Sequence, residues 1–444
     1  MMTDTIVSII TALQESAISV LRLSGSEAVE IANKVFTRDL EKAASHSVLY
    51  GHITDPITGQ VIDEVLTSVF RAPKTYTRED VVEISCHGGV LVTKKILSLL
   101  LSVGARLAQP GEFTQRAFLN GRIDLSQAES VMELISAPNE FAQEIAISGV
   151  QGSVKSLIEP LLEELIQIIA NIEVNIDYPE YDDVNVLTEE TLLPDSKRFL
   201  VALEKILKES KSGKILKEGV KTVILGKPNV GKSSILNVLL EEDKAIVTDI
   251  AGTTRDLVEG WIQLEHVALH LVDTAGLRDT GDVIEKIGIE KSRAALETAE
   301  LCILVFDASK TMDDEDLALL EATKDKERII VYNKEDLAHE KQDGIYVSAI
   351  NHDVNDLINE INARYVEHKV ALSRPTLSNE RHIAQVQKSY LAMQSAISAM
   401  EFGMELDLVI IDLNESYTEL AAVIKLREDI NILDEIFARF CLGK

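Results

Sequence analysis

The residues best suited to chemistry lie near the middle of the chain, in the segment VILGKPNVGKSS at 223–234. Gly226 and Gly231 belong to the spacing G-x-x-x-x-G-K-S, which follows β-branched residues and precedes the helical pattern SSILNVLLEE. Strand, glycine-rich turn and helix together predict a P-loop, in which backbone N–H groups and a helix N-terminus surround phosphate oxygens. Lys232 is expected to reach the β- and γ-phosphates, and the Ser233 hydroxyl to ligate Mg²⁺.

Three further motifs follow in order, each after a strand-like run. HLVDTAG ends at 273–276, which suits a metal-linked carboxylate and a sensor of the γ-phosphate, and YVSAI supplies Ser348 and Ala349 for a short loop beside a base. IIVYNKED contains N-K-x-D, in which Asp336 is expected to accept hydrogen bonds from the ring N–H and amine of guanine. Because strands alternate with helices, the region from about 216 to 366 resembles a Ras-like GTPase domain with a parallel, doubly wound sheet.

The pattern departs from Ras at Leu277, because Ras-type enzymes carry a water-orienting glutamine there. Leucine cannot orient water, so catalysis must come from elsewhere. In AIVTDIAGTTRD, 245–256, Thr254 is the expected Mg²⁺-binding threonine, and backbone carbonyls together with Asn229 are suited to caging a monovalent cation. The following DTGDVIEKIGIEKS offers acidic residues to hold the attacking water.

Composition limits the class of protein. A chain of 444 residues should form about two to four domains. The formal net charge of -29 argues against binding nucleic acid through a general positive field, so any RNA contact needs a local basic patch or a partner. The start has no signal-peptide pattern, and no apolar run reaches the roughly 18 residues of a membrane span, so a cytoplasmic protein without a membrane anchor is expected.

The three cysteines, Cys86, Cys302 and Cys441, are far apart and show neither disulfide nor C-x-x-C spacing. The ending Cys-Leu-Gly-Lys lacks the aliphatic residues and final residue of a prenylation signal. Two interpretations of the tail therefore stay open, a frayed end and a working part.

Helical patterns flank the P-loop region. Within 156–177, apolar residues recur at helical spacing and predict one buried face made of Leu157, Leu161, Leu165, Ile168 and Ile172. NERHIAQVQKSYLAMQSAISAM and LDLVIIDLNESYTELAAVI also predict helices. Helices on both sides of a complete α/β unit favour an inserted domain over three domains in tandem.

GKPNVGKSS, DIAGTTRD, DTAGLR and the terminal FCLGK together resemble the tRNA modification GTPase MnmE (TrmE) family, over essentially the whole chain. REDVVEISCHGG and QPGEFTQRAFLNGRIDLSQAE look like the family's N-terminal blocks. The resemblance implies a multidomain α/β plus α fold. Its parts are an N-terminal α/β domain that binds folate and dimerises, a discontinuous helical domain, and an inserted Ras-like P-loop GTPase domain. The predicted boundaries are 1–120, 121–215 with 367–444, and 216–366.

For the GTPase domain, the resemblance implies a complete contact set. The GTP-binding residues are Asn229, Val230, Gly231, Lys232, Ser233, Ser234, Thr248, Asp249, Ile250, Ala251, Gly252, Thr253, Thr254, Asp273, Thr274, Ala275, Gly276, Asn333, Lys334, Asp336, Ser348 and Ala349. Of these, Ser233 and Thr254 bind Mg²⁺, and the K⁺ ligands are Asn229, Thr248, Ile250 and Thr253. Glu285 matches the catalytic glutamate, and its neighbour Asp282 has no assigned role. Arg255 and Arg278 either stabilise the switch segments across a dimer or form surface salt bridges.

For the N-terminal domain, the resemblance implies that Arg22, Glu83, Arg122 and Lys444 contact 5-formyltetrahydrofolate or a related one-carbon folate. Cys441 acts in tRNA modification, as a nucleophile or as a pocket wall. TALQESA, 11–17, replaces a glycine-rich stretch of the family, and Ser85–Cys86 replaces Gln-Gly, so a differently shaped folate pocket is expected. His87 receives no catalytic role.

The implied activity is that of a Mg²⁺-dependent, K⁺-stimulated GTPase that forms a homodimer. With the flavoprotein MnmG (GidA), it forms the 5-carboxymethylaminomethyl or aminomethyl group on the wobble uridine of certain tRNAs. Two alternatives stay open: an Era-type, RNA-binding GTPase of ribosome assembly, and a folate-binding scaffold whose GTPase is an assembly switch. K⁺-stimulated turnover distinguishes the first hypothesis from both alternatives.

Overall fold

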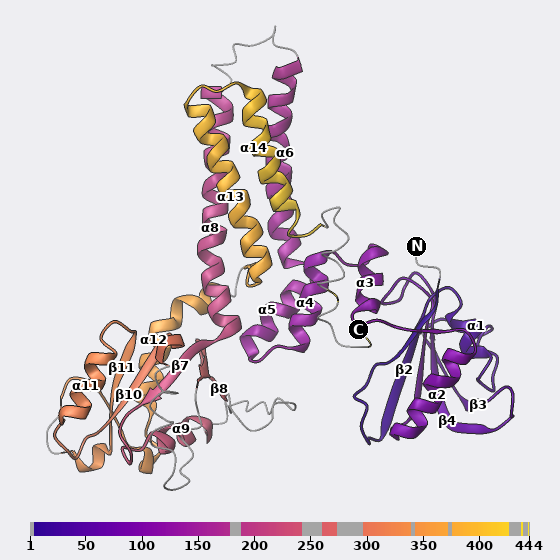
Figure 1. Cartoon of the computed structure of the whole chain (residues 1–444), viewed down its shortest axis with the longest axis horizontal. Coiled ribbons are helices and arrows are strands. Elements are labelled where there is room, and N and C mark those ends of the chain that lie inside the picture. The colour runs from indigo at the N-terminus through magenta and orange to yellow at the C-terminus, as the bar shows by residue number, and fades with distance from the viewer. Residues whose placement is uncertain are drawn as a thin grey trace. The chain divides into compact units, whose positions relative to one another are not determined.

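The computed structural model describes residues 4–177, 188–241, 260–272, 296–338, 342–371, 375–425, 437 and 443 (Figure 1). The chain separates into two compact units. Unit 1 comprises 1–132 and 424–444, and unit 2 comprises 133–423. Each unit has a six-stranded sheet.

The sheet of unit 1 has the strand order β3-β4-β5-β2-β1-β6. Neighbouring strands are antiparallel except for β1 and β6. The strands are β1 Ile6–Ile9, β2 Ile18–Ser24, β3 Ser47–Thr54, β4 Val61–Phe70, β5 Val81–His87 and β6 Arg106–Leu107. Val82, Ile84 and Cys86 alternate along β5 and are buried, because every second side chain faces the core. This core is covered by α1 Ala28–Asn33 and α2 Val90–Ser102.

A buried ionic cluster stabilises the remainder of unit 1. The helix α3 Glu112–Leu119 carries Arg116, which is 1% exposed and forms ion pairs with Asp4, Glu79 and Glu112. A buried cation is tolerated only when carboxylates of this kind surround it. Three carboxylates converge on Arg116, so α3 is anchored both to the chain start and to the loop before β5.

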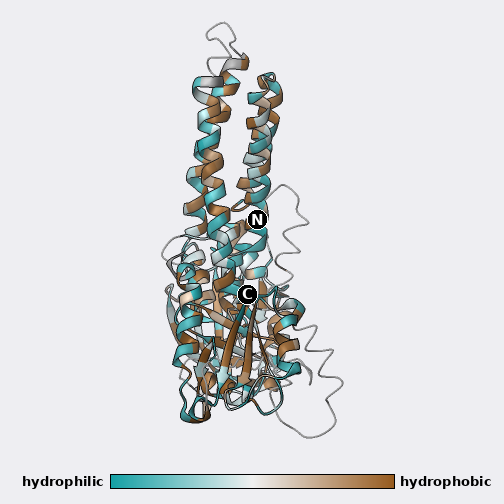
Figure 2. Ribbon diagram, turned by 90° about the vertical axis from the view of Figure 1, so that its left-hand side faces the viewer, coloured by the Kyte–Doolittle hydropathy of each residue, from teal (hydrophilic) through white to brown (hydrophobic). Residues whose placement is uncertain are grey.

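Long helices form much of unit 2, and hydrophobic and hydrophilic residues alternate along them (Figure 2). They are α6 Ser153–Asp177, α8 Leu193–Glu218, α13 Glu380–Glu401 and α14 Leu406–Ala421, with the shorter α5 Glu140–Val150 beside them. The predictions for α13 and α14 are confirmed. In α6, Leu165, Ile168 and Ile172 are buried as predicted, but Leu157 and Leu161 are only half-buried. Their neighbours Ile158 and Leu162 occupy the buried positions instead.

The second sheet, in unit 2, has the order β12-β11-β10-β7-β9-β8. Its strands are β7 Val220–Leu225, β8 Gly260–Gln263, β9 Ala268–Leu271, β10 Leu301–Asp307, β11 Arg328–Asn333 and β12 Ile345–Val347. All neighbouring pairs are parallel except β8 and β9, which are antiparallel. The predicted parallel, doubly wound sheet therefore has one antiparallel pair at this edge, where the segment Leu264–Val267 is too short for a crossover connection.

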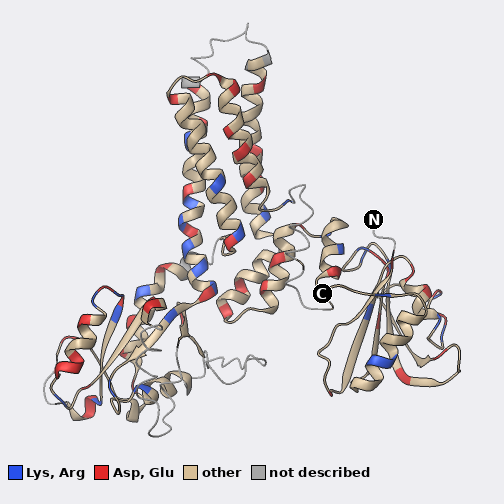
Figure 3. Cartoon of the chain, viewed as in Figure 1, with Lys and Arg blue, Asp and Glu red and all other residues tan. Residues whose placement is uncertain are grey.

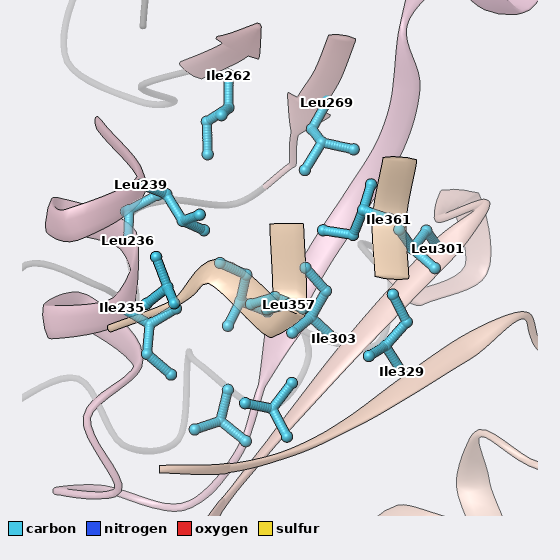
Figure 4. Packing of buried hydrophobic residues seen from close by; sticks show 14 of the residues in the cluster. Ile235, Leu236, Leu239, Ile262, Leu269, Leu301, Ile303, Ile329, Leu357 and Ile361 are labelled. Carbon is cyan, nitrogen blue, oxygen red and sulfur yellow. The ribbon is translucent and has the colours of Figure 1, made fainter. Parts of the chain in front are cut away.

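Helices α9 Lys232–Glu241, α11 Asp314–Ala322 and α12 Asn355–Ala371 accompany this sheet. Figure 4 shows Ile235, Leu236 and Leu239 of α9 and Leu357 and Ile361 of α12 among the buried side chains of one core. A second cluster, which includes Val223, Cys302 and Phe306, forms from the other side chains of β7 and β10. Apolar side chains on both sides of the central strands are what a doubly wound sheet requires.

The sheet with its helices is inserted within the helical part of the chain. Helix α8, which precedes the insertion, packs against α13, which follows it. The segment just before α13 also lies close to α8, since a Cβ on Gly213 of α8 would lie 2.8 Å from the Leu377 carbonyl oxygen. The insertion in the predicted fold class is thus confirmed. The exact domain boundaries stay predictions, and those at 216 and 366 fall inside α8 and α12.

Charged side chains are distributed along the helices of unit 2 (Figure 3). The basic residues of α8 largely pair with acids: Lys197 with Glu401, Lys217 with Glu133, and Arg198 with two carboxylates. These pairs neutralise much of the positive charge on that helix. None of the described helices is both long and apolar enough to span a membrane.

Candidate functional site

Two glycines shape the turn between β7 and α9. Gly226 has φ +156, and an added Cβ would lie 2.3 Å from the Val305 carbonyl oxygen of β10. Gly231 has φ +95, and an added Cβ would lie 2.0 Å from Nδ2 of Asn333. Both positions need positive φ and close approach, so only glycine fits. The turn then leads directly into α9, as the P-loop motif predicts.

Asn333, at the end of β11, joins three of the predicted segments. Its side chain is buried; Nδ2 donates to the Val230 carbonyl at 2.8 Å, and Oδ1 accepts from the Ala349 N–H at 3.1 Å. One amide therefore connects the P-loop, the N-K-x-D strand and the Ser-Ala loop. Because both of its polar ends are satisfied inside the protein, Asn333 acts as a support of the site.

These segments surround a cavity of about 360 Å³ at the end of the parallel strands. Open α/β sheets bind ligands at this position. Of the predicted GTP-binding residues, the cavity is lined by Asn229, Gly231, Lys232, Ser233, Ser234, Asn333, Lys334, Asp336, Ser348 and Ala349. Pro228 and Ile350 also line it and were missed, although Pro228 lies within the P-loop motif and Ile350 directly follows the Ser-Ala motif. The Val230 side chain is buried in the core, and the Val230 carbonyl oxygen accepts the hydrogen bond from Asn333.

Hydrogen bonds orient the polar side chains of this nucleotide cavity. Nζ of Lys232 donates to the Lys227 carbonyl at 2.9 Å, and Oγ of Ser348 donates to Oδ1 of Asp336 at 2.9 Å. Nζ of Lys334 donates to Oδ2 of Asp307 at 2.6 Å. Burial raises the pKa of Asp307, but hydrogen bonds from Lys334 and Ser309 outweigh it, so the pKa lies below its usual value. Asp307 is therefore an anion at neutral pH.

Other predicted residues lie outside the described part of the chain. They are Thr248, Asp249, Ile250, Ala251, Gly252, Thr253, Thr254, Arg255, Asp273, Thr274, Ala275, Gly276, Leu277, Arg278, Asp282, Glu285, Cys441 and Lys444. Their roles stay predictions.

A second cavity, of about 550 Å³, lies within unit 1 and brings together Arg22, Glu83 and Arg122. Nη2 of Arg22 lies 2.8 Å from Oε1 of Glu83, on the adjacent strands β2 and β5. The guanidinium of Arg122 lies 4.8 Å from the centre of the Tyr76 ring. The three predicted folate residues thus share one cavity although their positions in the sequence are far apart.

Sequence reasoning missed Lys74, Tyr76 and Arg78, which line the same cavity. Arg78 has φ 59, and its Nη1 donates to the Asn120 carbonyl at 2.9 Å. Four cationic side chains and one carboxylate, Glu83, occur in the described lining. This excess of positive charge, together with an aromatic ring, suits an anionic ligand that carries a flat ring.

The atypical segment 11–17 lies beside Gly88. Ser16 N–H donates to the Gly88 carbonyl at 3.0 Å, and an added Cβ on Gly88 would lie 2.2 Å from the Ser16 oxygen. No residue of 11–17 is among the described lining of the Arg22 cavity. His87 pairs instead with Asp63, at 2.7 Å between Nδ1 and Oδ1. The expectation of a differently shaped folate pocket stays a prediction.

Two residues of the tail pack within unit 1. Phe437 is 2% exposed and contacts a cluster that includes Phe118, Ala128 and Met132. Gly443 has φ +97, and an added Cβ would lie 2.7 Å from the Ile9 carbonyl oxygen at the end of β1. Residues this closely packed do not belong to a frayed end.

A P-loop that shares one cavity with N-K-x-D and Ser-Ala loops, at the end of this sheet, defines a P-loop GTPase. Family models agree: the MnmE helical domain matches residues 125–441, and the N-terminus of the GTP-binding protein TrmE matches 5–122. The chain belongs to the MnmE family of GTPases.

Full-length relatives support this assignment. The tRNA modification GTPase MnmE of Streptococcus pyogenes is 47% identical over 451 residues, covering 99% of this chain and 98% of its own. The protein of the same name from Enterococcus faecalis is 47% identical over 457 residues, with the same coverage. The solved G domain of the T. maritima FeoB iron transporter is 26% identical, with a TM-score of 0.25 over 34% of this chain and 98% of that one. The family assignment depends on the full-length relatives.

Proposed function

We propose that this protein hydrolyses GTP in the modification of tRNA. With the flavoprotein MnmG (GidA), it would form the 5-carboxymethylaminomethyl or aminomethyl group on the wobble uridine, as a homodimer in the cytoplasm. The observation that carries the GTP part is the single cavity shared by the P-loop and the N-K-x-D loop. The tRNA part is supported by the name of relatives that match 99% of the chain.

Different residues of the nucleotide cavity bind the phosphates and the base of GTP in this proposal. Backbone N–H groups of the P-loop and the Lys232 ammonium bind the phosphates. The Asp336 carboxylate, held by Ser348, accepts from the N–H and amine of guanine. In this proposal the triphosphate would lie at the start of α9 and the base beside β11 and β12.

Asp336→Asn is expected to weaken GTP binding by about 10–100-fold, because a hydrogen bond to a charged group contributes about 1.5–3 kcal/mol. The same change should favour xanthine, whose oxygen at the amine position can accept from an amide. The change in base preference is measured by the concentrations of GTP and of XTP that displace a fluorescent GDP from the protein. Asp343→Asn, an exposed position in the same domain, is the control. An unchanged GTP-to-XTP preference would reject the base assignment.

The metal ligands proposed are Ser233 and Thr254 for Mg²⁺, and Asn229 with the backbones of Thr248, Ile250 and Thr253 for K⁺. When bound, these cations supply positive charge against the phosphates during hydrolysis. Of the proposed K⁺ ligands, Asn229 lies in the described part of the chain. It lines the nucleotide cavity and has a left-handed backbone conformation, with φ 63. Its amide oxygen is a ligand type that hard cations accept.

Asn229→Ala is therefore expected to remove K⁺ stimulation and to lower turnover in K⁺ by about 10²–10³-fold, the size of one lost charge-stabilising group. Affinity for GTP should stay near the parent value, because the phosphate cradle is backbone. Turnover with GTP in K⁺ and in Na⁺ measures this, with the exposed Asn414→Ala of α14 as control. K⁺ stimulation that survives in Asn229→Ala would reject the ligand role.

The Arg22 cavity is the proposed folate site. Arg22, Arg122 and the tail residue Lys444 would bind the folate, while Glu83 orients Arg22 through their ion pair. Stacking of Arg122 on Tyr76 provides a flat surface of the kind that a pterin ring contacts. Cys441 would act in the modification of the uridine, as a nucleophile or as a pocket wall.

A further inference from the structure

Asp307 lies one strand away from the N-K-x-D loop and belongs to none of the GTPase motifs. It ends β10, in parallel register with Asn333, the last residue of β11. The two strand ends are also joined by the Ala308 N–H, which donates to the Asn333 carbonyl at 2.8 Å. Asp307 is therefore held next to the proposed base site without being among the residues that line the nucleotide cavity.

The Asp307 carboxylate is fixed at both of its oxygens. Its side chain is 7% exposed. Oδ1 accepts from the Ser309 hydroxyl at 2.6 Å and from the Ser309 N–H at 3.1 Å. Oδ2 accepts from Nζ of Lys334 at 2.6 Å. A buried anion with three donors of this kind has little freedom to turn.

Lys334 lines the nucleotide cavity together with Asp336. Its backbone has φ 65, and its side chain is 29% exposed. With the ammonium tied to Asp307 at one end and the backbone fixed at the other, the methylene chain of Lys334 is held along one direction. A lysine side chain that is free in solution has many rotamers, and ordering them opposes binding.

We infer that Asp307 is a positioning residue for base recognition, which acts by holding the Lys334 side chain as one wall of the base site. This inference rests on the proposed function, since it takes guanine as the ligand of the cavity. The wall is ordered before the nucleotide arrives, so binding loses less side-chain entropy. Asp307 would contact neither the base nor the phosphates. It therefore contributes to the affinity for nucleotide and not to the rate of hydrolysis.

Asp307→Asn tests this inference, because asparagine has nearly the same shape as aspartate but carries no charge. The amide keeps an oxygen for Ser309 but presents an NH₂ group, which cannot accept from the Lys334 ammonium. GTP and GDP should both bind about tenfold more weakly, the size of the rotamer entropy of one long side chain. The equilibrium titration uses a ribose-labelled fluorescent GDP, and turnover assays with GTP should show a raised KM at nearly unchanged kcat.

A double-mutant cycle with Lys334→Met separates positioning from general support of the fold. Methionine keeps an unbranched, apolar chain and needs no anion. In the Lys334→Met background, adding Asp307→Asn should change GDP affinity by less than about twofold, because the partner through which Asp307 acts has been removed. Glu321→Gln, which breaks the surface pair of Glu321 with Lys324 in the same domain, is the matched control and should change nothing.

Either of two results would overturn the inference. One is parental GDP affinity in Asp307→Asn. The other is an equal loss of affinity in both backgrounds, which would make Asp307 a structural residue. A wild-type protein that binds no labelled GDP would instead reject the proposed function, and the inference with it.

Discussion

Deleting Cys441 to Lys444 is expected to abolish wobble-uridine modification in cells while leaving K⁺-stimulated GTP hydrolysis nearly intact. The described residues of the nucleotide cavity all lie between 228 and 350, so the deletion removes none of them. Gly443 packs against Ile9 in unit 1 and the proposed folate residues share that unit, so the deletion should affect only the chemistry on tRNA.

Nucleoside analysis of tRNA from complemented cells, with turnover of the purified protein, measures the two functions separately. Cys441→Ser tests the thiol and should show most of the same defect. Gly443→Ala keeps the thiol but places a Cβ 2.7 Å from the Ile9 oxygen, so it should displace the tail. Gly59→Ala, also at positive φ but with nothing within 4 Å, is its control. Parental levels of modified nucleoside in the deletion would show that the tail has no role in the modification.

Glu285→Ala is expected to lower kcat by roughly 10²–10⁴-fold, the range for a positioned acid–base group. GTP affinity should change little, because the proposed phosphate and base contacts come from other residues, which line the nucleotide cavity. Leu277 supports this expectation, since it offers no group to orient water where Ras-type enzymes use glutamine. Single-turnover hydrolysis in K⁺ isolates the chemical step.

Asp282→Ala is the matched control for Glu285→Ala. It removes a carboxylate three positions away, for which no role is proposed. Near-parental hydrolysis in Glu285→Ala, or equal losses in both variants, would contradict the catalytic assignment and leave the identity of the water-positioning group open.

The nucleotide cavity was largely predictable because its motifs are local in sequence. The G-x-x-x-x-G-K-S spacing and N-K-x-D each follow a strand, and parallel strands bring their carboxyl ends to one edge of the sheet. Asn333 was therefore found, but its structural role was not. That role is a hydrogen bond to Val230, more than a hundred residues earlier in the chain, which no local pattern contains.

Features set by tertiary packing were harder to predict. The antiparallel β8–β9 pair follows from the short connection between the two strands, which the alternation of strands with helices did not reveal. In α6, adjacent apolar pairs such as Leu157–Ile158 and Leu161–Leu162 leave the buried face ambiguous, and packing selects the second residue of each pair. Lys74 and Arg78 reach the Arg22 cavity from an irregular loop that carries no periodic signal.

Action of this GTPase on tRNA can be tested by nucleoside analysis of total tRNA from a strain that lacks its gene. We expect the 5-carboxymethylaminomethyl or aminomethyl derivatives of wobble uridine to disappear in that strain. They should return with the parent gene but not with one that encodes Glu285→Ala. An unchanged nucleoside profile, with a failure of ribosomal subunits to mature, would reject a role in tRNA modification and favour an Era-type GTPase.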